Sequence, residues 1–289
     1  MTYLIATILL NTVLFALFKL FPKFKIDGLQ AIVVNYFVCV ITGSIFLEKF
    51  PITTKSLQHD WFPWALLMGA MFISLFNLIA WRTKEDGMTT TTIANKLSLV
   101  IPVLFSVWLY NEQLTFLKIL GILIAAPAVY FTTRADNSQP RSILFPALLF
   151  VGSGLLDTLV KYVEDSFLQD SQEQAEYTIH LFATAAIIGL FVIVVQKLRD
   201  KINLHGRNMV AGILLGGPNY FSIYFLIRLL HSDFLQSSSA IPVNNIGIVL
   251  LSAVSAIVFF KEKITWKRAL GLCLSIVAIL LIALSDLYG

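Results

Sequence analysis

The chain has 289 residues, of which 57% are hydrophobic and 13% are charged, and its formal net charge is +4. Soluble domains carry about 25% charged residues, so this composition excludes an ordinary soluble globular protein, because so many apolar side chains cannot be hidden in one aqueous core. The small positive charge fits loops on the two sides of a membrane and gives no indication of nucleic-acid binding.

Ten apolar segments follow one another along the chain. Each is long enough to cross about 30 Å of hydrocarbon at about 1.5 Å per helical residue. They run over residues 2–20, 28–47, 61–81, 89–110, 115–133, 142–161, 176–197, 207–229, 236–259 and 265–285. The connections are too short to fold as separate domains. We therefore predict an all-α membrane protein with ten transmembrane helices.

A shift of 150 residues reveals a weak internal repeat. It relates Asn95 to Asn245, Glu112 to Glu262, Thr115 to Thr265 and Gly121 to Gly271. The polar stretch Arg134–Arg141 interrupts the apolar pattern and is the expected junction between the halves. Each half then has five spans, and because five is odd, the second half must enter the membrane from the opposite side. The predicted domains are a five-helix repeat over residues 1–135 and an inverted five-helix repeat over residues 141–289.

Ionisable side chains inside the spans are the main indication of function, because they are costly at membrane depth and usually face a bundle interior or a water-filled path. Lys96 lies seven residues into the fourth segment, about 10 Å from its start. Asp157 lies deep in the sixth segment, and Lys161 follows it at i+4, a spacing that favours an ion pair. Two interpretations of that pair stay open. It is either a structural pair near a helix end or a coupling carboxylate and its lysine that face a cavity.

Amide side chains are spread through the same spans. Polar groups at matched positions of two inverted halves are where a central binding site is expected. The candidate substrate contacts are therefore Asn95 and Lys96 in span four with Asn244 and Asn245 in span nine, joined by Asn11, Asn219 and Tyr220. Each asparagine taken singly could instead hold two helices together.

Other polar features are interpreted as structural. Thr115 and Thr265 are predicted N-caps of the helices that follow them, and Glu112 and Glu262 add negative charge at positive helix ends. The spacing of Gly212 and Gly216 predicts close helix packing. The sequence has no metal-binding motif and no nucleophile–base set at depth, so we predict no enzyme, no metal and no cofactor.

The two turn regions resemble the EamA-type branch of the drug/metabolite transporter superfamily. The matching residues are Pro102-Val-Leu with Asn111-Glu112-Gln-Leu-Thr115, and Phe259-Phe-Lys-Glu262-Lys-Ile-Thr265, each followed by a glycine. The resemblance implies a secondary transporter of two five-span copies with a central cavity and alternating access. It also implies termini in the cytoplasm. The lysines and arginines concentrate after odd-numbered spans and favour termini outside, so the orientation stays open.

The sequence therefore predicts a secondary transporter that exports a small polar metabolite, such as an amino acid, across the plasma membrane, which in a bacterium is the inner membrane. Its expected partners are the substrate, a proton coupled through Asp157, and the lipid bilayer, with the protein as a monomer or a homodimer. Two alternatives remain open. One is a receptor or assembly subunit that keeps the fold without transport, and the other is efflux of cationic drugs through Asp157.

Overall fold

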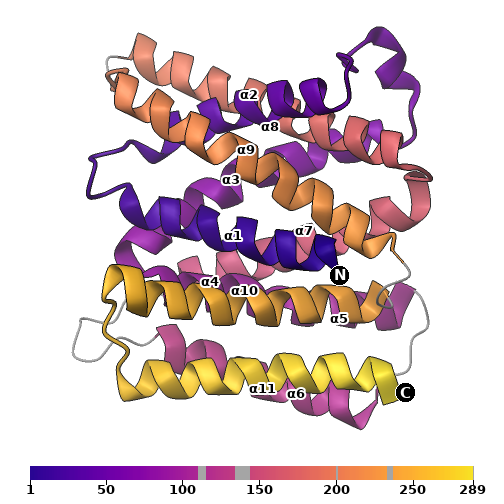
Figure 1. Ribbon diagram of the computed structural model, residues 1–289, viewed down its shortest axis with the longest axis vertical. Helices are drawn as coiled ribbons and strands as arrows, with labels where there is room; N and C mark the ends of the chain where they lie inside the picture. Colours follow the sequence, from indigo (N-terminus) through magenta and orange to yellow (C-terminus); the bar gives the residue numbers. More distant parts are fainter. Residues whose placement is uncertain (110–114, 134–143, 200, 233–236, 289) are drawn as a thin grey trace.

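A computed structural model describes residues 1–109, 115–133, 144–199, 201–232 and 237–288, and these form helices and short turns without a strand. Figure 1 shows long helices that run nearly parallel or antiparallel, with both chain ends at the same edge of the bundle. Eight helical spans in this part of the chain are long and apolar enough to cross a membrane. The protein is therefore a multi-pass, all-α membrane protein, as predicted, while the ten-span count and the inversion of the halves stay predictions.

The helices follow the predicted segments closely. The first half contains α1 (Thr2–Leu20), α2 (Gly28–Phe46), the 3-10 turn η1 (Thr54–Gln58), α3 (Phe62–Asp86), α4 (Met88–Lys96), the 3-10 turn η2 (Leu97–Leu99), α5 (Val100–Leu109) and α6 (Phe116–Thr133). The second half contains α7 (Leu144–Phe167), α8 (Ser171–Leu198), α9 (Gly206–Leu230), α10 (Ser237–Phe260) and α11 (Trp266–Tyr288). The predicted junction Arg134–Arg141 and the turn residue Glu112 lie outside the described residues.

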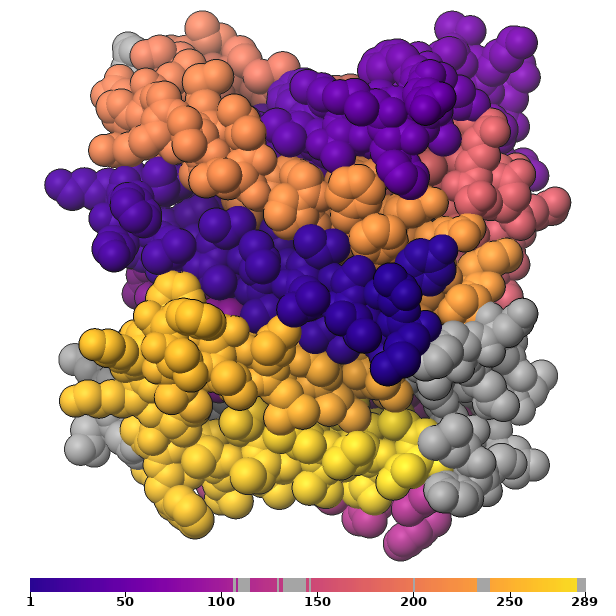
Figure 2. All heavy atoms as spheres, in the orientation of Figure 1, coloured from indigo at the N-terminus to yellow at the C-terminus, as the bar shows by residue number. Residues whose placement is uncertain are grey.

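The helices of the two halves pack against each other throughout the bundle. α2 runs along α9, α3 runs along α8, and α6 runs along α11. In Figure 2 α1 lies between α9 and α10. A Cβ atom on Gly212 or Gly216 would overlap Val34 or Val38 of α2, which confirms the close packing predicted from the glycine spacing. The two halves therefore share one core.

The outer face of the bundle is apolar, as a lipid-facing surface must be. Leu9 on α1 and Ile213 on α9, for example, are about half exposed. At the helix ends, the predicted threonine caps are confirmed. The hydroxyl of Thr115 accepts from the N–H of Lys118 at 3.3 Å, and that of Thr265 accepts from the N–H of Arg268 at 3.5 Å. The polar side chains inside the bundle are therefore surrounded by an apolar outer surface.

Candidate functional site

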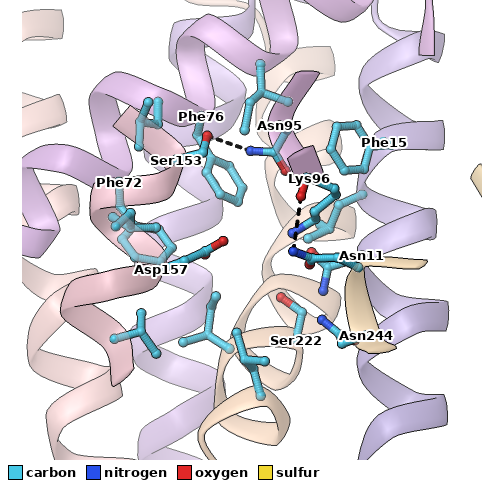
Figure 3. Close-up of a pocket in the computed structure, with 18 of the residues that line it drawn as sticks. Asn11, Phe15, Phe72, Phe76, Asn95, Lys96, Ser153, Asp157, Ser222 and Asn244 are labelled. Carbon is cyan, nitrogen blue, oxygen red and sulfur yellow. Dashed lines mark hydrogen bonds between the residues drawn. The ribbon is translucent and has the colours of Figure 1, made fainter. Parts of the chain in front are cut away.

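A cavity of about 70 Å³ lies among six helices, α1, α3, α4, α7, α9 and α10. A water molecule needs about 10–15 Å³ on this measure, so the space admits several waters or a small solute. Figure 3 shows its main polar side chains, which are Asn11, Asn95, Lys96, Ser153, Asp157, Ser222 and Asn244. Asn245 also lines the cavity. A space between helices of both halves that contains polar and charged side chains is the kind of place where transporters bind solutes.

The helix that carries Lys96 is broken immediately after it. α4 ends at Lys96, and a 3-10 turn over Leu97–Leu99 precedes α5. Pro102 explains the break, because a proline has no N–H to donate to the carbonyl four residues earlier, that of Ser98, and its ring clashes there. A stretch of 3-10 helix inside a span often marks a functional hinge.

A backbone carbonyl beside the cavity takes part in a contact between the halves. Lys96 is the N-cap of the 3-10 turn, so its carbonyl accepts the first i→i+3 hydrogen bond of that turn. The side chain of Asn245, from α10 in the other half, donates a second hydrogen bond to the same carbonyl at 3.3 Å. Asn245 thus holds the broken helix in place from across the bundle.

A second amide fixes the broken helix against α7. The side-chain N–H of Asn95 donates to the hydroxyl of Ser153 at 2.7 Å, and both side chains are buried. Ser153 and Asp157 are four residues apart, on one face of α7. This bond therefore places Lys96 and Asp157 on opposite walls of the cavity, where Figure 3 shows the carboxylate directed across the space toward the lysine.

Two further asparagines present polar atoms to the same space. The side-chain oxygen of Asn244 is buried and has no hydrogen-bond partner among the residues that the structure describes. Asn11 donates its amide N–H to the carbonyl of Thr7 at 3.0 Å, and its side-chain oxygen takes no part in this bond. A buried acceptor without a donor is costly, so the oxygen of Asn244 is a natural contact for an N–H group of a bound solute.

Aromatic rings form the apolar part of the lining. Phe72 and Phe76 of α3 stack with their centroids 5.9 Å apart, and Phe18 of α1 meets Phe76 edge-on at 5.7 Å. Phe15 also lines the cavity. Aromatic side chains combine a large apolar area with little rotational freedom. The cavity can therefore hold a solute with a charged head and an apolar body.

The structure brings together six of the nine predicted site residues, namely Asn11, Asn95, Lys96, Asp157, Asn244 and Asn245. Asn219 and Tyr220 lie elsewhere, fully buried, where Asn219 donates to the side chain of Asn35 in α2 at 3.2 Å. Lys161, one turn beyond Asp157, is not part of the lining. Within the described chain no group of three His, Cys, Asp or Glu side chains is placed to hold a metal ion.

Sequence reasoning missed Ser153, Ser222 and the phenylalanines of the lining. Serines are common in spans, where their hydroxyls form hydrogen bonds within or between helices. The presence of a serine in a span therefore does not indicate a binding site. The phenylalanines could have been found from the spacing of Phe72, Phe76 and Ile79, which puts them on one face of a helix.

Residues 2–134 match the EamA-like transporter family. The resemblance predicted from the turn motifs, to a branch of the drug/metabolite transporter superfamily, is thereby confirmed. The match over residues 2–134 supports a membrane transporter of the drug/metabolite type, which implies a small-molecule substrate and a bilayer environment.

Two relatives cover nearly the whole chain. An uncharacterized protein of Haemophilus influenzae is 26% identical over 287 residues, which are 96% of this chain and 95% of that protein. A solved crystal structure of a protein covers 96% of this chain and 97% of its own, with a TM-score of 0.60 and 12% identity. The second likeness shows that the fold of the whole chain, not only of its first half, recurs elsewhere.

Proposed function

We propose that this EamA-like transporter moves a small zwitterionic metabolite, such as an amino acid, and that the direction is export. The observation that carries the proposal is the pair of opposite charges, Lys96 and Asp157, on facing walls of one cavity. A carboxylate on the substrate would meet the ammonium of Lys96, and an ammonium on the substrate would meet Asp157. Because the charges of the two side chains cancel when both are ionised, the cavity then has no net charge and needs no counter-ion.

The remaining lining gives the substrate its orientation. The unpartnered oxygen of Asn244 would accept from the substrate ammonium, while Asn95 and Asn245 hold the two walls at their separation. Phe72 and Phe76 would cover an apolar side chain. Efflux of cationic drugs is the second candidate because of Asp157, but the facing Lys96 would repel a cation that lacks an anionic group.

The transport mechanism in this proposal is alternating access between two inverted repeats, residues 1–135 and 141–289. The reciprocal packing supports it, since α2 of the first half runs along α9 of the second while α8 of the second runs along α3 of the first. The break at Leu97–Leu99 supplies a hinge at the cavity. Asp157 would carry the coupling proton when the substrate has left the cavity, and would release it when the substrate ammonium binds. The proposed location is the plasma membrane.

The test is substrate counterflow with protein reconstituted in lipid vesicles, after a thermal-shift screen has selected a substrate. The screen compares α-amino acids with their amides, which lack the carboxylate, and with their N-acetyl derivatives, which lack the ammonium. We expect only the intact zwitterions to stabilise the protein, and Lys96→Met and Asp157→Asn to abolish both the shift and counterflow. The matched control is Lys84→Met, at an exposed position of α3. Counterflow that survives both cavity substitutions would refute the site.

A further inference from the structure

The face of α3 that lines the cavity continues toward the end of the helix as a charged stripe. Phe72, Phe76 and Ile79 line the cavity, and Arg82 and Asp86 follow Ile79 by three and seven residues, on the same helix face. Arg82 and Asp86 form an ion pair and are only 7% and 9% exposed. The cavity wall therefore ends in a buried ion pair on the side where α3 meets α4.

Glu262 of the second half lies against the junction between α3 and α4. Gly87, between α3 and α4, has φ 95° and ψ 163°, a conformation that is almost confined to glycine. A Cβ atom there would overlap the carboxylate of Glu262. Glu262 thus places a negative charge at the N-terminus of α4, the positive end of the helix. The turn motif that caps α11 also reaches the start of the helix that carries Lys96.

Arg268 completes the contact between the halves. Its guanidinium lies 4.0 Å from the carboxylate of Glu262 and donates to the carbonyl of Asp86 at 3.5 Å. Both carboxylate oxygens of Glu262 are buried and, within the described part of the chain, lack a hydrogen-bond partner. The charge of Glu262 is therefore balanced only by charge–charge attraction, which a small separation of the halves would remove.

We propose that Arg82 and Asp86 of the first half with Glu262 and Arg268 of the second form a lock that closes this end of the cavity. The four charges alternate in sign and sum to zero, so they are stable together in a buried place and unstable when one partner is withdrawn. Opening this end pulls α10–α11 away from the start of α4 and exposes the charges to water, which hydrates them. The inference rests on the proposed transport function, because the lock has a role only in a transporter. The experiment that tests it needs no substrate.

The test measures how fast a cysteine buried within the lock, next to Arg82, reacts with a water-soluble maleimide. Thr83 is the reporter position, because it is fully buried on α3 and its hydroxyl has no partner. Thr83→Cys is made in protein whose two native cysteines are replaced, Cys39→Ala and Cys273→Ser. Labelling is followed in detergent, after size-exclusion chromatography has shown a single folded species. We expect slow labelling with the lock intact.

Neutral substitutions of similar shape, Glu262→Gln and Arg268→Met, should raise the labelling rate at least about tenfold, which corresponds to about 1.4 kcal/mol. Arg268→Lys keeps the charge and should keep most of the protection. The matched control is Lys263→Gln, an exposed charge one residue from Glu262, which should change nothing. Unchanged rates in both neutral variants, or an equal rise in the control, would overturn the lock. Counterflow that fails while the lock behaves as expected would overturn only the proposed function.

Discussion

The hydrogen bond between Asn245 and the carbonyl of Lys96 gives a prediction that separates structure from binding. Asn245→Leu removes the side-chain donor but keeps the approximate shape of the side chain. The carbonyl of Lys96 then keeps only its hydrogen bond within the 3-10 turn. We expect a destabilised protein in which the hinge at α4 has lost its contact with the second half.

The size of the effect follows from the hydrogen bond that is lost. A hydrogen bond between uncharged groups contributes about 0.5–1.5 kcal/mol to stability. For a chain of this size about 1 kcal/mol lowers the melting temperature by about 2–4 °C. We therefore expect a decrease of about 1–6 °C in the melting temperature of detergent-solubilised protein.

The adjacent residue is the matched control. Asn244 is 2% exposed, and its oxygen has no partner to lose, so Asn244→Leu should lower the melting temperature by less than half as much. It should instead abolish the thermal shift caused by an α-amino acid, which Asn245→Leu should only weaken. Equal melting temperatures for the two variants would refute the role of Asn245 in the hinge. A full ligand shift in Asn244→Leu would refute the role of Asn244 in binding.

Three further predictions use the same purified protein. Gly87→Ala should destabilise the fold by about 1–3 kcal/mol, because alanine is strained at the φ of this position, while Gly206→Ala, which has open space around it, should leave the melting temperature unchanged. Gly216→Leu should separate α9 from α2 and prevent the recovery of monodisperse protein in size-exclusion chromatography, whereas successful recovery would contradict the close packing. Lys96→Met and Asp157→Asn should each lower the melting temperature, because an unpaired buried charge costs up to about 3–5 kcal/mol of stability. The double variant should recover most of that loss without recovering the ligand shift, and purely additive losses would show that the two charges do not interact.

The fold was predictable because apolar length is a strong signal in a membrane. A span such as Thr2–Leu20 leaves no other way to satisfy its backbone than a helix, and the turn threonines Thr115 and Thr265 fix where the next helices begin. The sequence could not show how helices pair, because lipid-facing and buried faces are equally apolar. The partnership of α2 with α9, for example, depends on Gly212 and Gly216 meeting Val34 and Val38.

The sequence could predict which polar residues line the cavity where burying them elsewhere costs much free energy. The prediction failed where a buried hydrogen-bond partner makes that cost small. Lys96 and Asp157 had to face a cavity because neither charge is stable in lipid. Asn219 had an inexpensive alternative, a bond to Asn35 across the α2–α9 contact, and sequence alone cannot separate such an amide from one that lines a cavity. Glu262 shows a different failure. Its turn was interpreted as a local cap, whereas the structure also places its carboxylate against Gly87, 175 residues earlier in the chain.

The internal repeat explains the scaffold of the site but not its charges. Under the 150-residue shift Asn95 corresponds to Asn245, and these two amides hold the cavity walls from opposite halves. The same shift relates Lys96 to Ile246 and Asp157 to Thr7, which is buried and bonded to its own helix. Both charges are therefore confined to α4 and α7, and their mirror positions are neutral. A substrate held between α4 and α7 meets only neutral side chains at the mirrored positions of α1 and α10. A ligand shifts the equilibrium between two conformations only if it binds them with different affinity. Contacts that differ between the two halves allow such a difference when the halves move relative to each other.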